Sequence, residues 1–466
     1  MPGGQLQLNS LTGNNSFLNV NPQMSYFKTV YYKYHNYAKI THYLDFKTEG
    51  ENNFLQDNKF TISIPKNGDL IKEFYIKVKI PELTLQQDNS CGSHIADIKW
   101  VDNIQYNIIK SITFSIGGKV IQTFDSVFLY TYYTLLLNNE GKHRLNNLNS
   151  INRNLGKNED LTEWNIEKNG SGIDSCYTKI DNSLLILHSE ELLIPIPVWF
   201  SKEPFPITSL EYNTLDVILE TRSLTELVLY RYNSSKWSLP LADNSIFNNQ
   251  FTISPSIILN YIYLHKDELE QYYANTYKFL IETYQDVYEC DILSNKVHRY
   301  RDNILTYEYE SFGPTKDIFI LPRREDYKTR GERFNFTNSL YMNDDANTIR
   351  PGRNIIEGMS IKFNAIMRLE EKHKSYFTDL ELFKNYISTY KNNDIYIYNF
   401  ALEPSFTCPS GHCNLTRINK ILLNIRINEP TSINNTTKPV LDLMIYNRYY
   451  NILEIENGFT KLLYFT

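Results

Sequence analysis

The sequence predicts an all-β protein built from two β-sandwiches, and three observations support this. First, its 466 residues include 36 Tyr and 25 Phe, and aromatic residues make up 14% of the chain; aromatic and β-branched residues favour strands. Second, apolar and polar residues alternate in short blocks that end at Pro or Gly, which is typical of strands with one buried face. Third, such blocks occupy both halves of the chain, and this length suits roughly two to four domains.

The first half contains the clearest alternation. Residues 60–64 and 74–80 carry apolar side chains at every second position, and each block stops at a proline. Residues 112–116 and 120–121 flank Gly117 and Gly118, a pair that predicts a two-residue hairpin turn, because such turns need positive φ. Further strands are expected at residues 215–219 and 227–230.

The second half repeats this style, with one helix. Strands are expected at residues 251–254, 257–263, 317–321, 395–402 and 421–428. Asp267 and Glu270 have the spacing of a capping box, which predicts a helix that begins with Asp267 as its N-cap.

These elements suggest a division into an N-terminal arm (1–27), a first sandwich (28–225) and a second sandwich (226–466). The boundary is expected between Thr221 and Gln250, since an Asn- and Ser-rich stretch that ends at Pro240 is typical of a linker. Two long polar segments, 138–182 and 323–358, are predicted to be loops that bury little apolar surface.

The arm carries no Lys, Arg, Asp or Glu before Lys28, and it contains scattered apolar residues. We expect it to pack on another surface; the alternative is a frayed terminus, since chain ends are commonly disordered.

Charge and composition exclude several classes of protein. The formal net charge of −6 argues against nucleic acid as the main partner, which would need a basic face. There is no run of about 18 apolar residues that would predict a membrane span and no signal-peptide pattern. Five scattered cysteines do not suggest a disulfide framework, and they fit a reducing compartment.

The strongest candidate for metal binding is the stretch from Cys408 to Cys413, which includes His412. A zinc site needs four ligands, usually in two spaced pairs, and the sequence contains no second cluster of this kind. We therefore interpret Pro409, Ser410 and Gly411 as a structural turn. The nine histidines are scattered and no nucleophile, phosphate-binding or dinucleotide motif occurs, so the sequence predicts neither an enzyme nor a cofactor.

Several blocks of the sequence nevertheless resemble a known family, the major capsid proteins of the large nucleocytoplasmic DNA viruses, which include iridoviruses, phycodnaviruses and marseilleviruses. The resemblance runs in order from residue 3 to about residue 460. It is carried by residues 3–8, 21–31, 116–121, 197–200, 210–217, 312–317, 395–419 and 446–458. Gly313 departs from the family's Phe-x-His-Pro-x-Lys-Glu stretch, because the family usually has His there.

The most specific block is 395–419, which is similar to the family's Tyr-Ser-Phe-Ala-Leu-x-Pro and Pro-Ser-Gly-x-Cys-Asn-Phe-Ser-Arg-Ile-Asp. It departs mildly at four positions, namely Asn399, Leu415, Thr416 and Asn419. The residues that match the turn motif of this block are Pro409, Ser410, Gly411, Asn414 and Arg417.

The resemblance implies a double jelly roll, that is, two eight-stranded antiparallel β-sandwiches with a few short helices in loops. It further implies a virion protein without catalytic activity that is assembled in the host cytoplasm. Three chains would form a nearly hexagonal capsomer, and capsomers would tile an icosahedral shell with minor capsid proteins around an inner membrane, without direct nucleic-acid binding. Two alternatives remain at this point: an enzyme on a related double jelly roll, and a carbohydrate-binding β-sandwich protein.

Overall fold

A computed structural model describes most of the chain. The described residues are 5, 34–86, 95–101, 103–148, 177–181, 184–187, 190–232, 251–274, 276–292, 299–301, 303–325, 331–337, 354–386, 395–406, 408–428, 441–456 and 458–464. The chain divides into two compact units, residues 1–37 and 38–466. Of the predicted arm, only Gln5 is among the described residues, so the predictions about residues 1–27 lie outside them.

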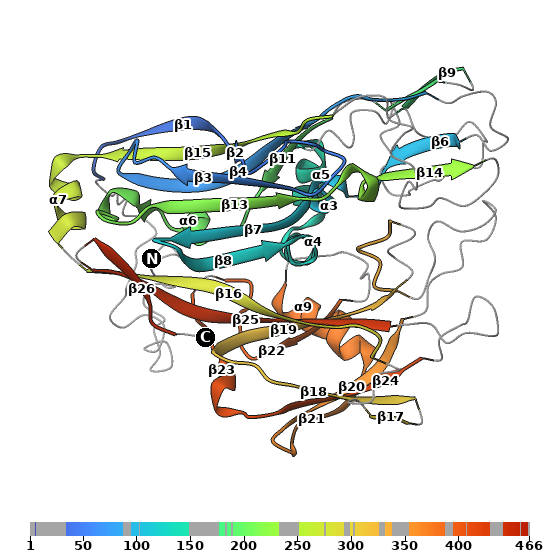
Figure 1. The fold of residues 1–466 in the computed structure, drawn as a ribbon. Coiled ribbons are helices and arrows are strands. Elements are labelled where there is room, and N and C mark those ends of the chain that lie inside the picture. The colour runs from blue at the N-terminus through green and yellow to red at the C-terminus, as the bar shows by residue number, and fades with distance from the viewer. Residues whose placement is uncertain are drawn as a thin grey trace. The chain divides into compact units, whose positions relative to one another are not determined.

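The first sandwich is formed by two antiparallel sheets (Figure 1). One has the strand order β1-β15-β4-β11, and its strands are β1 (Tyr37–Asp45), β15 (Ser254–Leu264), β4 (Leu70–Ile80) and β11 (Glu190–Pro195), with the short β12 (Phe205–Pro206) beside β4. The other has the order β2-β3-β13-β7-β8 and consists of β2 (Lys47–Thr48), β3 (Asn58–Ile64), β13 (Leu215–Thr221), β7 (Ile109–Ile116) and β8 (Lys119–Asp125).

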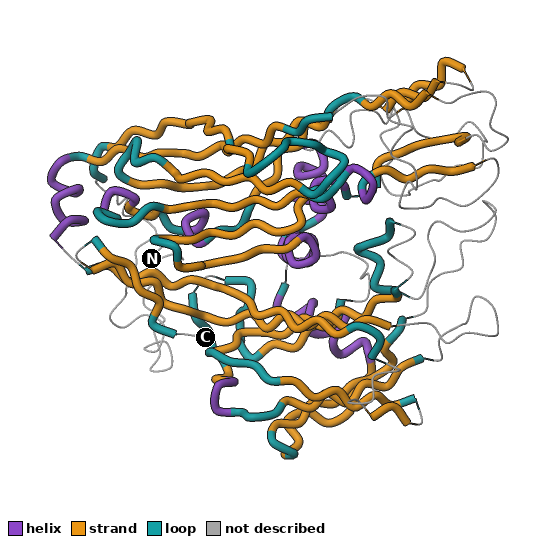
Figure 2. Tube along the Cα trace, in the orientation of Figure 1, coloured by secondary structure: helices purple, strands orange, loops and turns teal. Residues whose placement is uncertain are grey.

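Further elements of the first half lie in its connections (Figure 2). There are two small sheets. One contains β5 (Leu83–Gln86), β10 (Leu184–Leu187) and β9 (Tyr177–Asp181), and the other contains β14 (Val228–Tyr232) and β6 (Ile95–Trp100). The helices are α3 (Ile104–Asn107), α4 (Ser126–Leu136), α5 (Asn139–Leu148) and α6 (Trp199–Lys202), with 3-10 turns η2 (Ile207–Ser209) and η3 (Leu224–Glu226).

The second sandwich also has two antiparallel sheets. The first has the order β16-β25-β19-β22 and consists of β16 (Tyr277–Glu289), β25 (Leu441–Glu456), β19 (Pro314–Arg324) and β22 (Tyr396–Asn399), with β23 (Cys413–Asn414) and β26 (Phe459–Leu462) paired to β19 and β25. The second has the order β17-β18-β24-β20-β21, formed by β17 (Arg299–Arg301), β18 (Ile304–Tyr309), β24 (Ile421–Ile427), β20 (Ile356–Phe363) and β21 (Ile366–His373). The π-helix η5 (Tyr376–Leu380), helix α9 (Glu381–Asn385) and the 3-10 turn η6 (Leu415–Arg417) lie in its connections.

The two sandwiches repeat one strand order. Counted along the chain, the eight main strands are β1, β3, β4, β7, β8, β11, β13 and β15 in the first sandwich, and β16, β18, β19, β20, β21, β22, β24 and β25 in the second. In both, strands one, eight, three and six form one sheet, and strands two, seven, four and five form the other. This is the jelly-roll order, so the predicted double jelly roll with two eight-stranded sandwiches is confirmed.

The predicted boundary at residues 225/226, and the interval 221–250 around it, is wrong. Strand β15 is the eighth strand of the first jelly roll and pairs with β4 from Ser254 opposite Lys79 to Ile262 opposite Leu70. The first jelly roll therefore extends to Leu264. The polar stretch after residue 232 resembled a linker, but the sheet still needed a strand to satisfy the hydrogen-bonding groups along β4.

Most of the predicted strands are present in the described residues, but residues 251–253 are not in a strand and Ser254 is the first residue of β15. The alternation of apolar and polar residues did not predict the two longest strands of the second jelly roll, β16 and β25; only the family resemblance of residues 446–458 pointed to a closing strand. In β25 the first eleven residues are all buried. A strand that is covered on both faces does not alternate between apolar and polar residues, so the period of two on which the prediction depended is absent.

The predicted helix is α7 (Lys266–Ala274), which connects β15 to β16. Its N-terminus differs from the prediction, because the backbone N–H groups of Glu268 and Leu269 donate to the carbonyl of His265. Asp267 therefore lies in the first turn and is not the cap.

The expectation that segment 323–358 buries little apolar surface is wrong for residues 331–337. Phe336 is fully buried in the core of the first jelly roll, and Phe334 stacks on Tyr130 of α4 with ring centroids 4.4 Å apart. The segment is polar on average, so its composition did not reveal that Phe334 and Phe336 are buried. The segment 138–182 contains α5 (Asn139–Leu148) near its start and all of β9 (Tyr177–Asp181) near its end.

Candidate functional site

The described residues contain no group of three or more His, Cys, Asp or Glu side chains that could hold a metal ion. Among these residues there is also no helix with the length and hydropathy needed to cross a bilayer. The most unusual chemistry in the described interior lies where the two jelly rolls meet, on the face of β16, β25 and β19 that is turned toward β8, α4 and α6. We call this contact the seam.

An aromatic cluster forms one part of the seam. Phe128 of α4 stacks on Tyr284 of β16 with ring centroids 3.9 Å apart, and the ring of Tyr446 on β25 lies 5.7 Å from that of Phe128. Rings at these distances contribute more than their buried area alone. The cluster therefore connects a helix of the first jelly roll with two strands of the second.

Asp125 joins the same elements by hydrogen bonds. Its carboxylate caps α4 by accepting from the backbone N–H of Phe128 at 2.8 Å, and it accepts from the hydroxyl of Tyr446 at 2.7 Å. Its backbone N–H donates to the hydroxyl of Tyr284 at 2.8 Å. Burial raises the pKa of Asp125, while the bonds from Tyr446 and Phe128 oppose that increase.

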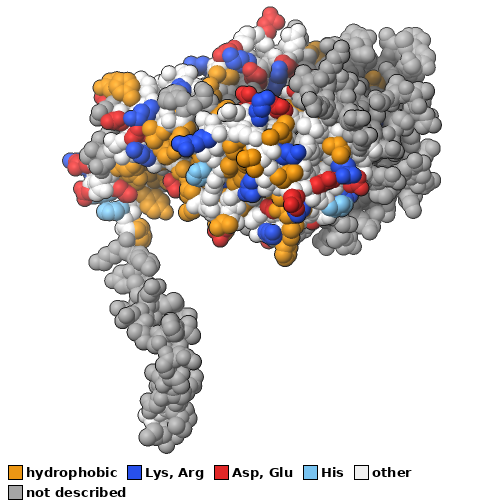
Figure 3. All heavy atoms as spheres, turned by 90° about the horizontal axis from the view of Figure 1, so that it is seen from below, with side chains coloured by type: hydrophobic (Ala, Val, Ile, Leu, Met, Phe, Trp, Pro, Cys, Tyr) orange, Lys and Arg blue, Asp and Glu red, His pale blue; other side chains and the backbone are white. Residues whose placement is uncertain are grey.

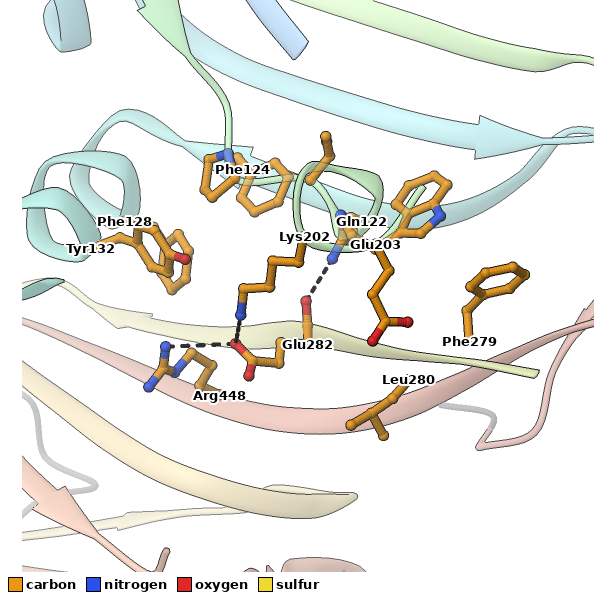
Figure 4. Close-up of a pocket in the computed structure, with 13 residues that line it drawn as sticks. Gln122, Phe124, Phe128, Tyr132, Lys202, Glu203, Phe279, Leu280, Glu282 and Arg448 are labelled. Atoms are coloured by element: carbon orange, nitrogen blue, oxygen red, sulfur yellow. Dashed lines mark hydrogen bonds and ion pairs between the residues drawn. The ribbon is translucent and has the colours of Figure 1, made fainter. Parts of the chain in front are cut away.

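Glu282 of β16 is the centre of a second network (Figure 4). Its carboxylate lies 2.7 Å from the ammonium of Lys316 on β19 and 3.3 Å from that of Lys202 in α6, and 3.8 Å from the guanidinium of Arg448 on β25. Its backbone carbonyl accepts from the side-chain amide of Gln122 on β8 at 2.6 Å. Glu282 thus binds two elements of the first jelly roll to the strands of the second.

Arg448 also forms a buried ion pair with Asp317 of β19. Its Nε donates to Asp317 at 2.9 Å, a second guanidinium nitrogen also contacts this carboxylate, and the exposed fractions of the two side chains are 3% and 0%. The hydroxyl of Tyr386 donates to Asp317 at 3.2 Å, and Arg448 donates to the carbonyl of Pro404 at 3.2 Å. Buried charges are tolerated when they are paired and hydrogen-bonded in this way.

The network determines which protonation states are stable. Burial by itself would raise the pKa of Glu282, but Arg448, Lys202 and Lys316 outweigh burial and lower this pKa to about 2. Burial lowers the pKa of Lys316, with Arg448 acting in the same direction. Burial would also lower the pKa of Arg448, but Asp317, Tyr386 and Glu282 raise it well above its usual range. Near neutral pH, Glu282 is therefore a carboxylate held by cations.

This arrangement predicts a pH-dependent contribution of Glu282 to stability. Because its folded-state pKa lies below the unfolded value, the contribution is complete above the unfolded pKa and is lost as the pH falls toward about 2. The difference in free energy of unfolding between wild type and Glu282→Gln, measured with urea at several pH values, should shrink between about pH 5 and pH 2. A difference that stays constant over this range would contradict the ionised network.

None of the sequence-predicted site residues is among the charged residues of the seam. Gly117 and Gly118 connect β7 to β8 with φ values of 57° and 81°. A Cβ on Gly117 would lie 2.7 Å from the side-chain oxygen of Asn213. This turn therefore requires glycine for both its dihedral angle and its close packing.

The residues of the predicted turn motif are brought together beside β19. Ser410 accepts a hydrogen bond from the backbone N–H of Glu403 at 2.9 Å. Asn414 pairs with Pro314 of β19 and caps η6 through the N–H of Thr416 at 3.2 Å. Pro409 and Arg417 are exposed. Cys408 and Cys413 are free thiols.

Gly411 has a φ of 138°, and a Cβ there would lie 3.2 Å from the carbonyl oxygen of Phe400. We expect Gly411→Val to lower the free energy of unfolding by about 1–3 kcal/mol, because a β-branched residue is strained in this conformation. Cys413→Ser should have a smaller effect. Thermal unfolding of both variants tests this, and stoichiometric zinc that wild type retains and Cys413→Ser loses would contradict a purely structural turn.

The seam residues were not predicted to form a site. Asp317 and Arg448 both lie in blocks that carry the family resemblance, and the available signal was a charged residue inside an otherwise apolar strand. A charge in a strand is more often solvated than buried, so pairing these residues required the register of β19 with β25, which places Asp317 opposite Arg448.

Comparisons with known proteins agree with this architecture. The family profile described as "Major capsid protein N-terminus" matches residues 25–265, and the one described as "Large eukaryotic DNA virus major capsid protein" matches residues 268–460. The first match ends one residue after β15.

The chain is also similar along its whole length to individual capsid proteins. It is 21% identical to the major capsid protein of Phaeocystis pouchetii virus and 22% identical to that of Paramecium bursaria Chlorella virus 1, in both cases over 100% of each chain. With the major capsid protein of Frog virus 3 it shares 22% identity over 86% of this chain and 85% of the relative.

Solved structures of the same kind share the fold. The PBCV-1 virus capsid matches with a TM-score of 0.67 and 18% identity over 95% of this chain and 100% of the other, and the Faustovirus major capsid protein with a TM-score of 0.63 and 10% identity over 93% of both. The two profile matches together span both jelly rolls. The chain therefore belongs to the non-enzymatic major capsid protein family of large eukaryotic DNA viruses, and it is a structural protein of the virion shell.

Proposed function

We propose that three copies of the chain assemble into a capsomer of nearly hexagonal outline, and that these capsomers tile an icosahedral shell. The observation that carries this proposal is the repeated strand order of the two jelly rolls. Three chains would present six sandwiches of one topology, which gives nearly sixfold packing from threefold symmetry.

The seam supports the same function. A capsomer can pack regularly only if the two jelly rolls of each chain keep a fixed relative orientation. The bonds that cross the seam, from Lys202 and Gln122 to Glu282 and from Tyr446 to Asp125, provide that constraint. Such groups have strict geometric requirements, so they select one arrangement of the two sandwiches.

Size-exclusion chromatography with light scattering tests the trimer, and electron microscopy of assembled particles tests the shell. A protein that is monomeric at every concentration, or that forms only open aggregates with no closed particles, would contradict this function. Neighbouring capsomers and minor capsid proteins are its proposed partners. An inner membrane would lie beneath the shell, and no direct contact with nucleic acid is proposed.

The N-terminal segment gives a further prediction about assembly. Residues 1–27 carry no charged side chain but include Leu6, Leu8, Leu11 and Phe17, each of which contributes roughly 1.5–3 kcal/mol when fully buried. We propose that the segment is buried at the base of the capsomer against neighbouring subunits or minor capsid proteins. Deletion of residues 1–19 should leave a folded trimer that forms no shells or fragile ones. Shells of normal yield and heat resistance from the truncated chain would contradict this role.

A further inference from the structure

The carboxylates of the seam differ in what neutralises them. In the second jelly roll, Glu282 and Asp317 are each paired with the guanidinium of Arg448. Asp125 belongs to the first jelly roll, and it forms no ion pair with a Lys, Arg or His in the part of the chain that the structure describes. The charge of Asp125 therefore lacks the direct compensation that the other two carboxylates have.

Neutral donors surround the Asp125 carboxylate instead. It accepts from the backbone N–H of Phe128 at 2.8 Å and from the hydroxyl of Tyr446 at 2.7 Å. The hydroxyl of Tyr284 lies 3.4 Å from the same carboxylate and accepts the backbone N–H of Asp125 at 2.8 Å. The residue is half-buried at the end of β8. The carboxylate thus lies where α4 meets β16 and β25, in surroundings that disfavour a charge.

Two charged residues on neighbouring elements act on Asp125 in opposite directions. Asp286 is an exposed residue of β16, opposite Tyr446 of β25, and its negative charge raises the pKa of Asp125. Arg222 follows β13 and donates to the hydroxyl of Ser126 at 2.8 Å; its positive charge lowers that pKa. Helix α4 has no charged residue. Burial has the largest effect, so the pKa of Asp125 is raised.

A protonated Asp125 can keep the bonds of this site. A neutral carboxyl group still accepts hydrogen bonds and gains one O–H donor. The oxygen of Tyr284 can accept the new bond, while Phe128 and Tyr446 continue to donate to the carboxyl group. Protonation therefore removes the cost of a desolvated charge and breaks no contact between the jelly rolls.

We propose that Asp125 makes the seam pH-sensitive: when its side chain takes up one proton, the contact of β8 and α4 with β16 and β25 becomes stronger. Acid therefore strengthens this part of the seam, and neutral pH weakens it. Glu282 behaves in the opposite way, because its cations hold its pKa at about 2. The inference concerns the single chain and does not depend on the proposed trimer.

Proton binding sets the direction of the effect. The pKa of Asp125 is higher in the folded chain than in the unfolded chain, so between these two values the folded state binds a proton that the unfolded state does not. The free energy of unfolding therefore rises as the pH falls through the folded pKa. The gain is complete near the unfolded value, which is about 3.9 for Asp.

Asp125→Asn tests this role, because Asn caps helices about as well as Asp and still accepts from Tyr446, but cannot take up a proton. Urea unfolding of full-length wild type and Asp125→Asn is compared between about pH 8 and about pH 4. The ratio of the wild-type folding constant to that of the variant should increase as the pH falls, by up to about tenfold per pH unit. A ratio that is constant, or that decreases toward acid pH, overturns the proposal.

Two neighbouring substitutions separate proton uptake from a merely structural role. Tyr446→Phe removes a hydroxyl that favours the charged form of Asp125, so the pH at which the ratio changes should move upward. Asp286→Asn removes a negative charge that favours the neutral form, so this pH should move downward. Each variant is compared with its own double variant that also carries Asp125→Asn. Shifts in the same direction, or no shift in either variant, overturn the proposal.

An exposed carboxylate provides the matched control. The sheet β17-β18-β24-β20-β21 lies at the bottom of Figure 1, and on the face shown in Figure 3 acidic side chains lie among basic ones. Glu371 of β21 is paired with Arg426 at 2.6 Å, and the hydrogen bond from Arg426 lowers the pKa of Glu371. The ratio of the wild-type folding constant to that of Glu371→Gln should therefore stay flat or decrease toward acid pH. An increase like that expected for Asp125→Asn would overturn the assignment to Asp125.

Discussion

Arg448→Met is expected to lower the free energy of unfolding by about 3–5 kcal/mol, because it leaves the carboxylates of Asp317 and Glu282 buried without their main cation. Arg448 contacts both carboxylates and is itself almost fully buried. Met retains most of the aliphatic volume of Arg, so the decrease in the free energy of unfolding comes from the missing charge and not from a cavity. Equilibrium unfolding in urea near neutral pH measures the effect.

A matched control is available on the surface of the second jelly roll. Arg426 makes two hydrogen bonds to Glu371, at 2.6 and 3.0 Å, but both side chains are about half exposed. Arg426→Met should cost about 1 kcal/mol or less, because exposed ion pairs contribute little. Equal losses for the two variants would show that burial of the network does not determine its importance.

Phe128→Ala is the second substitution with a large expected effect. Phe128 is buried and stacks on Tyr284 across the seam, so its truncation should cost about 3–5 kcal/mol, as in other cores. The packing that is lost is the contact between the two jelly rolls. We therefore expect calorimetry to show the unfolding transition of wild type broaden or divide into two in the variant.

Phe128→Leu removes the aromatic ring but keeps an apolar side chain, so it separates the contribution of ring stacking from that of buried volume. A substitution that keeps an apolar side chain of similar size should cost less than about 1.5 kcal/mol, and it should leave a single transition. If Phe128→Ala unfolds in a transition as sharp as that of wild type, with a loss below that of Phe128→Leu, then α4 does not couple the two sandwiches.

The seam also explains which parts of the structure could be predicted. Strands with one open face, such as β13, alternate between buried and half-buried residues, and the sequence shows this alternation directly. Strands β19 and β25 are covered on both faces, so apolar and polar residues do not alternate along them. The charged residues Lys316, Asp317 and Arg448 lie among their apolar side chains. The sequence does not show that Asp317 and Arg448 are paired; the register of β19 with β25 does.

The sequence by itself determined the fold class, the positions of most strands and the turn at Gly117 and Gly118, because each depends on residues within a few positions of one another. Only the tertiary structure decided that residues 254–264 complete the first jelly roll, that Phe334 and Phe336 enter its core, and that Glu282, Asp317 and Arg448 form one network. The physical reason is that these contacts join segments far apart in the chain. Their energies depend on burial and hydrogen bonding, which exist only after the sheets have paired.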